Sequence, residues 1–218
     1  MAVAMAAVAL AALSGCVPAP KPGTIDIVGD SILFQTFWHR QSEFTAGSPA
    51  GASIVSDARL GIGFPDMLAP EAKRAASGRP ATLVIALGTN DAGPVDGGWT
   101  SADDAELRAL MASVSPTACV VLVLPGYADK PAVPSTYRAD LTAGRKAMRQ
   151  AAADRAAKGR ATFVADWGAV ALAHPELTGD DGIHLAADAP AIPERRVNEA
   201  AGKAWTKVLW DGVRHCPS

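Results

Sequence analysis

The sequence predicts an α/β fold, a flavodoxin-like three-layer sandwich with a five-stranded parallel sheet. Short apolar runs typical of strands alternate with longer segments of helical apolar spacing along most of the chain. Several of these runs are continuously apolar, as strands buried on both faces of a parallel sheet usually are. Such alternation calls for right-handed crossovers, which cover both faces of the sheet with helices.

Five runs are expected to form the strands, and the third and fourth, ATLVIAL and CVVLVL, are the most apolar. The expected strands are Thr24–Gly29, Ala52–Ser56, Ala81–Leu87, Cys119–Leu124 and Ala161–Ala165. In open α/β sheets, ligands bind at the carboxyl ends of the strands. The loops after strands one, two, three and five are therefore the places where functional residues are expected.

The helical segments are expected at Ile32–Arg40, Phe64–Ala76, Ala102–Val114, Tyr137–Lys158 and Glu194–Trp210. A chain of 218 residues with 49% apolar and 19% charged residues fits one globular domain, and no internal repeat or second domain is found. The formal net charge is −2 and no long basic run occurs, so nucleic acid is not an expected partner.

The N-terminal segment differs from the rest of the chain. Met1 to Leu13 is almost wholly apolar but shorter than the roughly 20 residues that span a bilayer, so residues 1–15 are interpreted as a secretion signal. The following Leu-Ser-Gly-Cys16 resembles a bacterial lipobox, in which the cysteine is lipidated. Residues 16–23 would then form an extended tether, and the protein would be exported and anchored to the bacterial membrane or envelope through Cys16. No Lys or Arg precedes the apolar run, and a buried apolar helix with a chance cysteine is the alternative.

Two predicted strands are followed by candidate catalytic groups. Gly29-Asp30-Ser31 follows the first strand, where the Ser31 hydroxyl would face the crevice and its N–H would be free to bind an oxyanion. A plain N-cap serine is the alternative. Asp181 and His184 follow the fifth strand, and an Asp three residues before a His can bond Nδ1–H and leave Nε2 free to take a serine proton. The alternative is a surface histidine in a polar loop.

Two further loops carry candidate oxyanion donors. Asp57-Ala58-Arg59-Leu60-Gly61 follows the second strand, and a glycine there lets the backbone approach a ligand. A simple turn glycine is the alternative. Asn90, in Gly88-Thr89-Asn90-Asp91 after the third strand, can donate amide N–H bonds to a developing negative oxygen. A loop-forming asparagine, which is common, is the alternative.

Taken together and in this order, the blocks resemble the SGNH (GDSL-like) hydrolase family over about residues 24–212. That family has a Ser in a GDS block, a Gly, an Asn in a GxND block and a His in a DxxH block. The Asp57–Gly61 and Asp181–Leu185 segments also look like the SGNH domains linked to bacterial membrane O-acyltransferases. Residues 24–218 are accordingly expected to form an SGNH hydrolase domain. One departure is the Asp- and Pro-rich segment Ala186–Pro193, so substrate shape cannot be transferred from relatives.

The resemblance implies a serine ester hydrolase acting on acyl esters, O-acetyl esters among them, through a Ser31–His184–Asp181 triad and an acyl-enzyme. Ser31, Gly61 and Asn90 would hold the oxyanion. Gly61 is preferred to Gly63 because Asp57–Gly61 fits a DAxxG form of the family's glycine block. No metal-ligand spacing occurs among Cys, His and carboxylates, and the implied chemistry needs no cofactor. Small-molecule or glycan esters are the expected substrates. An O-acyltransferase of cell-envelope glycans, or a non-catalytic glycan- or acyl-binding lipoprotein, are the alternatives.

Topology predicts a disulfide between Cys119 and Cys216. Cys119 opens the fourth strand, at the sheet edge opposite the expected site, and the last helix should run back to that edge and deliver Cys216 beside it. An exported protein meets an oxidising compartment, which favours the bond. The alternative is a buried Cys119 and a free Cys216 in a frayed tail. Of the tryptophans, Trp38, Trp99 and Trp167 could line a sugar or acyl site or lie in the core.

Overall fold

The computed structural model describes residues 23–76, 81–93, 97–188 and 197–217. The predicted signal peptide, most of the tether and Cys16 lie outside the described residues, so the lipoprotein interpretation stays a prediction. Within the described ranges, no helix combines the length and apolar character that crossing a membrane would require.

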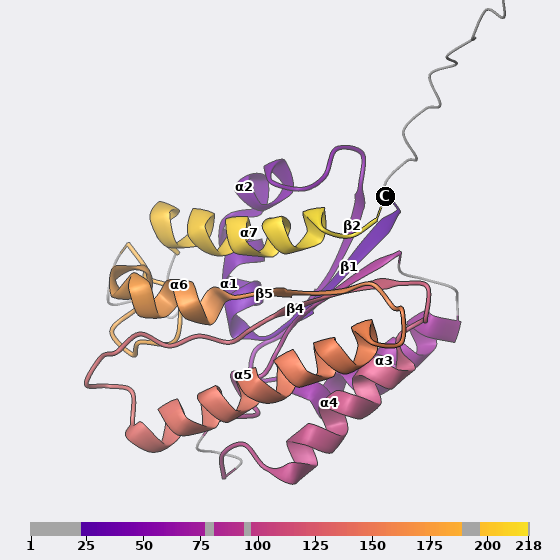
Figure 1. The fold of residues 1–218 in the computed structure, drawn as a ribbon. Helices are drawn as coiled ribbons and strands as arrows, with labels where there is room; N and C mark the ends of the chain where they lie inside the picture. Colours follow the sequence, from indigo (N-terminus) through magenta and orange to yellow (C-terminus); the bar gives the residue numbers. More distant parts are fainter. Residues whose placement is uncertain (1–22, 77–80, 94–96, 189–196, 218) are drawn as a thin grey trace, which may run out of the picture.

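The sheet has five strands, all parallel, in the spatial order β2-β1-β3-β4-β5 (Figure 1). This is the flavodoxin-like order, and it confirms the fold class predicted from the sequence. Every residue of β3 and β4 is buried, as their almost wholly apolar sequences predict, whereas the edge strands β2 and β5 are partly exposed. The strands are β1 (Thr24–Gly29), β2 (Ser53–Ala58), β3 (Thr82–Ala86), β4 (Cys119–Val123) and β5 (Thr162–Ala165).

Seven α-helices and one 3-10 turn accompany the sheet in the described part of the chain. They are α1 (Ser31–His39), α2 (Gln41–Ala46), α3 (Phe64–Ala76), α4 (Ser101–Ser113), α5 (Ser135–Ala156), α6 (Trp167–Ala173), the 3-10 turn Pro175–Leu177 and α7 (Glu199–Arg214).

Two apolar clusters fill the space between the sheet and its helices. One packs α1, α2, α6 and α7 against one face, with the fully buried Phe44, Trp205 and Trp210 at its centre. The other packs α3, α4 and α5 against the opposite face, around residues such as Phe64 and Met67. Figure 1 shows the sheet between these two helical layers. The three layers are those that the alternating sequence pattern predicts.

The last helix differs from the prediction at both ends. The predicted range began at Glu194 and ended at Trp210, whereas α7 runs from Glu199 to Arg214. Residues 194–196 lie outside the described part, and Val197 forms an isolated antiparallel bridge with Ala187, so its backbone is extended. Asn198 then accepts a hydrogen bond from the N–H of Ala201 and caps the helix. The helix therefore begins at this cap and not at the earlier polar residues.

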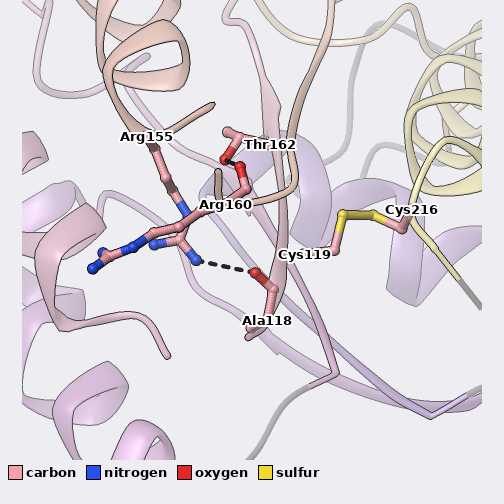
Figure 2. The surroundings of a disulfide bond; sticks show 6 residues. All are labelled: Ala118, Cys119, Arg155, Arg160, Thr162 and Cys216. Atoms are coloured by element: carbon pink, nitrogen blue, oxygen red, sulfur yellow. Dashed lines mark hydrogen bonds between the residues drawn. A yellow bond between two sulfur atoms is a disulfide. The ribbon is translucent and has the colours of Figure 1, made fainter. Parts of the chain in front are cut away.

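Cys119 and Cys216 form a disulfide with a Cα–Cα separation of 5.8 Å, the pairing predicted from the topology (Figure 2). Cys119 is the first residue of β4, and Cys216 follows α7, which runs back across the sheet to that edge (Figure 1). The buried guanidinium of Arg155 donates to the carbonyls of Ala118 and Ser115 beside the bond. The disulfide thus links the segment after α7 to the end of the sheet where the strands begin. Ser31 lies at the opposite end, where β1 finishes.

Candidate active site

Ser31 occupies the turn between β1 and α1, as the sequence predicts. Its neighbour Asp30 caps α1 by accepting the N–H of Ile32 at 3.0 Å, and the Asp30 N–H donates to the carbonyl of Ala86 on β3 at 3.2 Å. Ser31 is the first residue of the helix and only 9% exposed. Its own N–H therefore belongs to the helix N-terminus, where donors lack intrahelical acceptors and the helix dipole favours a negative charge.

His184 and Asp181 lie in one hydrogen-bonded chain with Ser31. The Ser31 Oγ atom is 3.0 Å from Nε2 of His184, and Nδ1 of His184 is 2.7 Å from Oδ2 of Asp181. A carboxylate at Nδ1 keeps the proton on that nitrogen, so Nε2 faces the serine hydroxyl as an acceptor. The structure thus brings together the three residues that the sequence predicts as a triad, in the order of contacts that nucleophilic catalysis requires.

The Asp181 carboxylate is held ionised by its surroundings. Partial burial alone would raise its pKa, but the hydrogen bond with the His184 side chain opposes this, and so does the N–H of Ile183, 2.9 Å from Oδ1. The His184 N–H donates to the same oxygen at 3.0 Å. Together these interactions lower the pKa of Asp181 to about 2. At neutral pH, Asp181 is therefore an anion that can stabilise a positive charge on His184.

The turn that carries Asp181 and His184 is fixed to the rest of the domain by backbone contacts. Gly182 has a φ of 70°, a conformation that other residues rarely adopt, and its carbonyl accepts the N–H of Ala128 at 2.8 Å. Lys130 donates through Nζ to the carbonyls of Thr178 and Gly179, at 2.8 and 2.9 Å. Sequence reasoning missed Lys130, because no local pattern marks a lysine that binds carbonyls 48 or 49 positions away.

Asn90 and Gly61 occupy the loops after β3 and β2 and line one cavity of about 360 Å³. The Asn90 side chain donates through Nδ2 to the carbonyl of Ile62 at 2.8 Å, which joins the two loops. Gly61 is exposed and has a φ of 73°. The alternative glycine, Gly63, donates its N–H to Asp66 at 2.9 Å, so that N–H is already engaged.

The loop after β2 begins beside the nucleophile turn. The N–H of Arg59 donates to the carbonyl of Gly29 at 3.1 Å, continuing the β1–β2 pairing by one residue. Arg59 also forms a two-pronged ion pair with Asp57, at 2.8 and 2.6 Å. Ser31 does not line the cavity that contains Gly61 and Asn90, as far as the described residues define it. The oxyanion roles of Gly61 and Asn90 therefore remain predictions.

Two buried carboxyl groups lie next to the predicted catalytic residues. Burial raises the pKa of Asp30 to about 6, against the lowering effect of the Ile32 N–H. Burial likewise raises the pKa of Asp91 to about 6, although the Phe64 N–H donates to it at 2.9 Å. These groups serve as acceptors that fix the loops after β1 and β3. Only Asp30 touches the nucleophile turn directly, since it caps the helix that Ser31 begins.

The three tryptophans considered for the site have different surroundings. Trp167 is only 1% exposed and belongs to the core, which was the alternative interpretation. Trp99 is partly buried, packs edge-on against Phe64 and donates its indole N–H to Asp104 at 2.9 Å. Trp38, by contrast, is 66% exposed on α1. Trp167 therefore has no surface to offer a substrate.

The chain matches a known protein family over most of its length. Residues 27–191 match the model of the GDSL-like lipase/acylhydrolase family, which covers most of the chain. This range contains all five predicted site residues of the triad and oxyanion hole. No curated protein sequence matches significantly.

Solved structures with the same architecture include enzymes that act on acyl esters. The catalytic domain of Streptococcus pneumoniae peptidoglycan O-acetyltransferase A superposes with a TM-score of 0.62 at 21% identity, covering 89% of this chain and 92% of that domain. A lipase/acylhydrolase from Enterococcus faecalis gives 0.65 at 18% identity, covering 88% and 95%. The acetylxylan esterase Axe2 from Geobacillus stearothermophilus, in a catalytic mutant, gives 0.62 at 13% identity, covering 89% and 93%. At such identities, these likenesses show the fold.

Proposed function

The chain belongs to the GDSL-like lipase/acylhydrolase family, and from this premise we propose that it is a serine hydrolase of carboxylic esters. The observation that carries the proposal is the continuous chain of hydrogen bonds from Ser31 through His184 to Asp181. Each member has the contact that its proposed role needs, and the nucleophile lies at a helix N-terminus. A protein that only binds a ligand would not need these three side chains in a hydrogen-bonded series, which argues against the alternative of a purely ligand-binding protein.

In the first half of the proposed reaction, His184 accepts the Ser31 hydroxyl proton on Nε2 while Oγ attacks the ester carbonyl carbon. The tetrahedral oxyanion is held by the N–H groups of Ser31 and Gly61 and by the Asn90 amide. The carbon–oxygen bond to the alcohol then breaks, and His184 returns the proton to the departing oxygen. The products are a free alcohol and an acyl group esterified to Ser31.

In the second half, a water molecule takes the place of the alcohol. His184 removes a proton from the water, and the water oxygen attacks the acyl carbon. Collapse of the oxyanion breaks the bond between the acyl carbon and Oγ of Ser31, and His184 returns its proton to Oγ, which releases the carboxylic acid and restores the Ser31 hydroxyl. The Asp181 carboxylate stabilises the imidazolium formed in each half-reaction, since its low pKa keeps it ionised. The proton balance closes within the triad, so this scheme assigns no step to a metal or cofactor.

Short acyl esters on a glycan are the substrate class that we propose. Two of the structural relatives are described as a peptidoglycan O-acetyltransferase and an acetylxylan esterase, and both transfer or remove acetyl groups on polysaccharides. The first of them also supports a second candidate function. If a sugar hydroxyl replaces water in the second half-reaction, the same acyl-enzyme becomes an O-acyltransferase intermediate.

Location at the cell envelope is a further part of the proposal and rests on the N-terminal sequence alone. Lipidation of Cys16 would place the domain beside envelope glycans. Replacing this residue (Cys16→Ser) should release the protein from bacterial membranes and leave its catalysis unchanged. A wild-type protein that is already soluble in the cell would remove this part of the proposal.

The proposed function is tested by measuring hydrolysis of p-nitrophenyl acetate by the purified wild-type protein and by the Ser31→Ala variant. A panel of p-nitrophenyl esters of increasing chain length and O-acetylated oligosaccharides then distinguishes substrates. Unacetylated oligosaccharides added as acceptors separate the two candidates, because a transferase forms acetylated sugar whereas a hydrolase releases acetate. Absence of Ser31-dependent turnover on every ester would contradict both.

A further inference from the structure

A group of three carboxylates lies beside the Asn90 loop and has no part in the proposed hydrolysis. Asp91 follows Asn90 directly, and Asp103 and Glu106 project from the first turns of α4. One carboxylate oxygen from each residue lies within 4.8 Å of those from the other two. Oxygens on opposite sides of one Ca²⁺ are about 5 Å apart, because each Ca–O distance is about 2.3–2.6 Å. The spacing therefore fits three ligands of one cation.

Asp91 is the buried carboxylate of the group, and one of its oxygens has no hydrogen-bond partner among the described residues. Asp91 is 5% exposed, and its Oδ1 atom accepts the N–H of Phe64 at 2.9 Å. Its Oδ2 atom is buried with no hydrogen-bond partner among the described residues. A buried carboxylate oxygen without a partner is costly, since water no longer solvates it. A cation shared with the two neighbouring carboxylates would satisfy this oxygen.

The surrounding cavity has the charge and size that a hydrated cation needs. Its volume is about 360 Å³, and Asp66 adds a fourth carboxylate to its lining. None of its described lining residues is a lysine or arginine. The Asp103 carboxylate is held in place by the N–H and hydroxyl of Thr100, at 2.6 and 2.7 Å, which leaves its orientation fixed relative to α4.

We propose that Asp91, Asp103 and Glu106 bind one divalent cation of the Ca²⁺ or Mg²⁺ type. All three ligands are carboxylates, the donors that these hard cations prefer, and water would complete the coordination shell. The bound ion ties the loop after β3 to the N-terminus of α4. It acts on the position of Asn90 and on stability, and takes no part in the proton transfers of the triad. The site does not depend on the proposed function.

Local sequence patterns do not reveal this site. Asp103 and Glu106 are three positions apart on one helix, which is also the spacing of an ordinary solvated helix face. Asp91 comes from the loop after β3 and joins them only because the fold brings this loop beside the start of α4. The proposed ligand set is therefore a product of the tertiary fold.

Calorimetric titration of the chelator-treated protein with CaCl₂, and separately with MgCl₂, tests the proposal without measuring activity. We expect one equivalent of at least one cation to bind saturably and to raise the melting temperature. Glu106→Gln keeps the side-chain shape and removes one charged ligand, so affinity should fall at least about tenfold. Asp91→Asn should have the same effect through the buried ligand.

Asp104→Asn is the matched control. Asp104 neighbours Asp103 on α4 but lies outside the carboxylate group, and an Asn oxygen can still accept the Trp99 N–H. This variant should bind the cation as the wild type does. The proposal is overturned if neither cation binds saturably up to about 10 mM, a range that includes weak extracellular sites. It is equally overturned if Glu106→Gln and Asp91→Asn both retain wild-type affinity.

Discussion

The hydroxyl oxygen of Ser31 lies 3.0 Å from Nε2 of His184, although 153 positions separate the two residues in the chain. Ser31 is placed by the end of β1 and the start of α1, and His184 by a turn fixed to the segment before α5. Both reach the same end of the sheet because all five strands are parallel. The contact thus depends on two features: the parallel strands bring both segments to one end of the sheet, and the turn around Gly182 then positions His184.

The first prediction concerns Asp181. Replacing the carboxylate by an amide (Asp181→Asn) keeps the size of the side chain but favours the wrong His184 tautomer, so kcat should fall by about 10⁴-fold. The substrate KM should change little, because Asp181 contacts His184 and the backbone. Steady-state kinetics on p-nitrophenyl acetate measures both. A kcat within tenfold of wild type would exclude Asp181 from the triad.

Asn90 is predicted to stabilise the oxyanion. Removing its amide (Asn90→Ala) should reduce kcat by roughly 10²–10³-fold and leave KM nearly unchanged, as loss of one oxyanion donor does. The variant also loses the bond to the Ile62 carbonyl, so its melting temperature serves as a control for loop damage. A variant with normal kcat and a raised KM would make Asn90 a binding residue instead.

The buried Asp30 predicts how stability depends on pH. Burial raises its pKa from the ordinary 3.8 to about 6, so between these values the folded protein binds a proton that the unfolded chain has released. Asp30 therefore makes the folded state less stable as pH rises from about 4 to 6, by at most about 3 kcal/mol. Denaturant unfolding at several pH values should show this decline, and Asp30→Asn should make it shallower. An identical pH profile in the variant would contradict the raised pKa.

The disulfide is predicted to act on stability far more than on catalysis. Cys119 and Cys216 are 97 positions apart, and closing a loop of this size reduces the entropy of the unfolded chain by an amount equivalent to about 4–5 kcal/mol at most. Reduction, or paired substitution by serine, should lower the melting temperature and leave room-temperature turnover nearly intact. Two free thiols in the unreduced, denatured protein would show that the bond does not form.

Much of the fold could be predicted because the strand sequences carry strong local signals. The apolar run ending at Leu124 can only be a buried strand or helix, and Pro125-Gly126 stops it at strand length. The short helices α2 and α6 were missed. The six residues of α2 depend on packing, since Phe44 is buried against Trp210 in the folded core. Helix propensity is a local property of the sequence, so it does not predict a contact between residues this far apart in the chain.

The predicted triad residues could be found because they stand in two short sequence blocks, one directly after β1 and one in the segment that follows β5, α6 and the 3-10 turn. Loops at the carboxyl ends of parallel strands are where such blocks meet. The supporting contacts could not be found in this way. The Lys130 bonds to Thr178 and Gly179 join distant segments, and so does the Asn90 bond to Ile62. Such hydrogen bonds depend on how the loops fold against one another, and no local sequence pattern predicts them.

Covalent labelling with a fluorophosphonate tests whether Ser31 is the nucleophile. Purified protein treated with a fluorophosphonate should be modified at Ser31 alone, as peptide mass spectrometry can establish, and should lose turnover in proportion to labelling. Ser31→Ala should resist labelling and show a kcat reduced by about 10⁶-fold, the loss seen when a triad nucleophile is removed. Labelling at another residue, or undiminished turnover in Ser31→Ala, would contradict the assignment of Ser31 as the nucleophile.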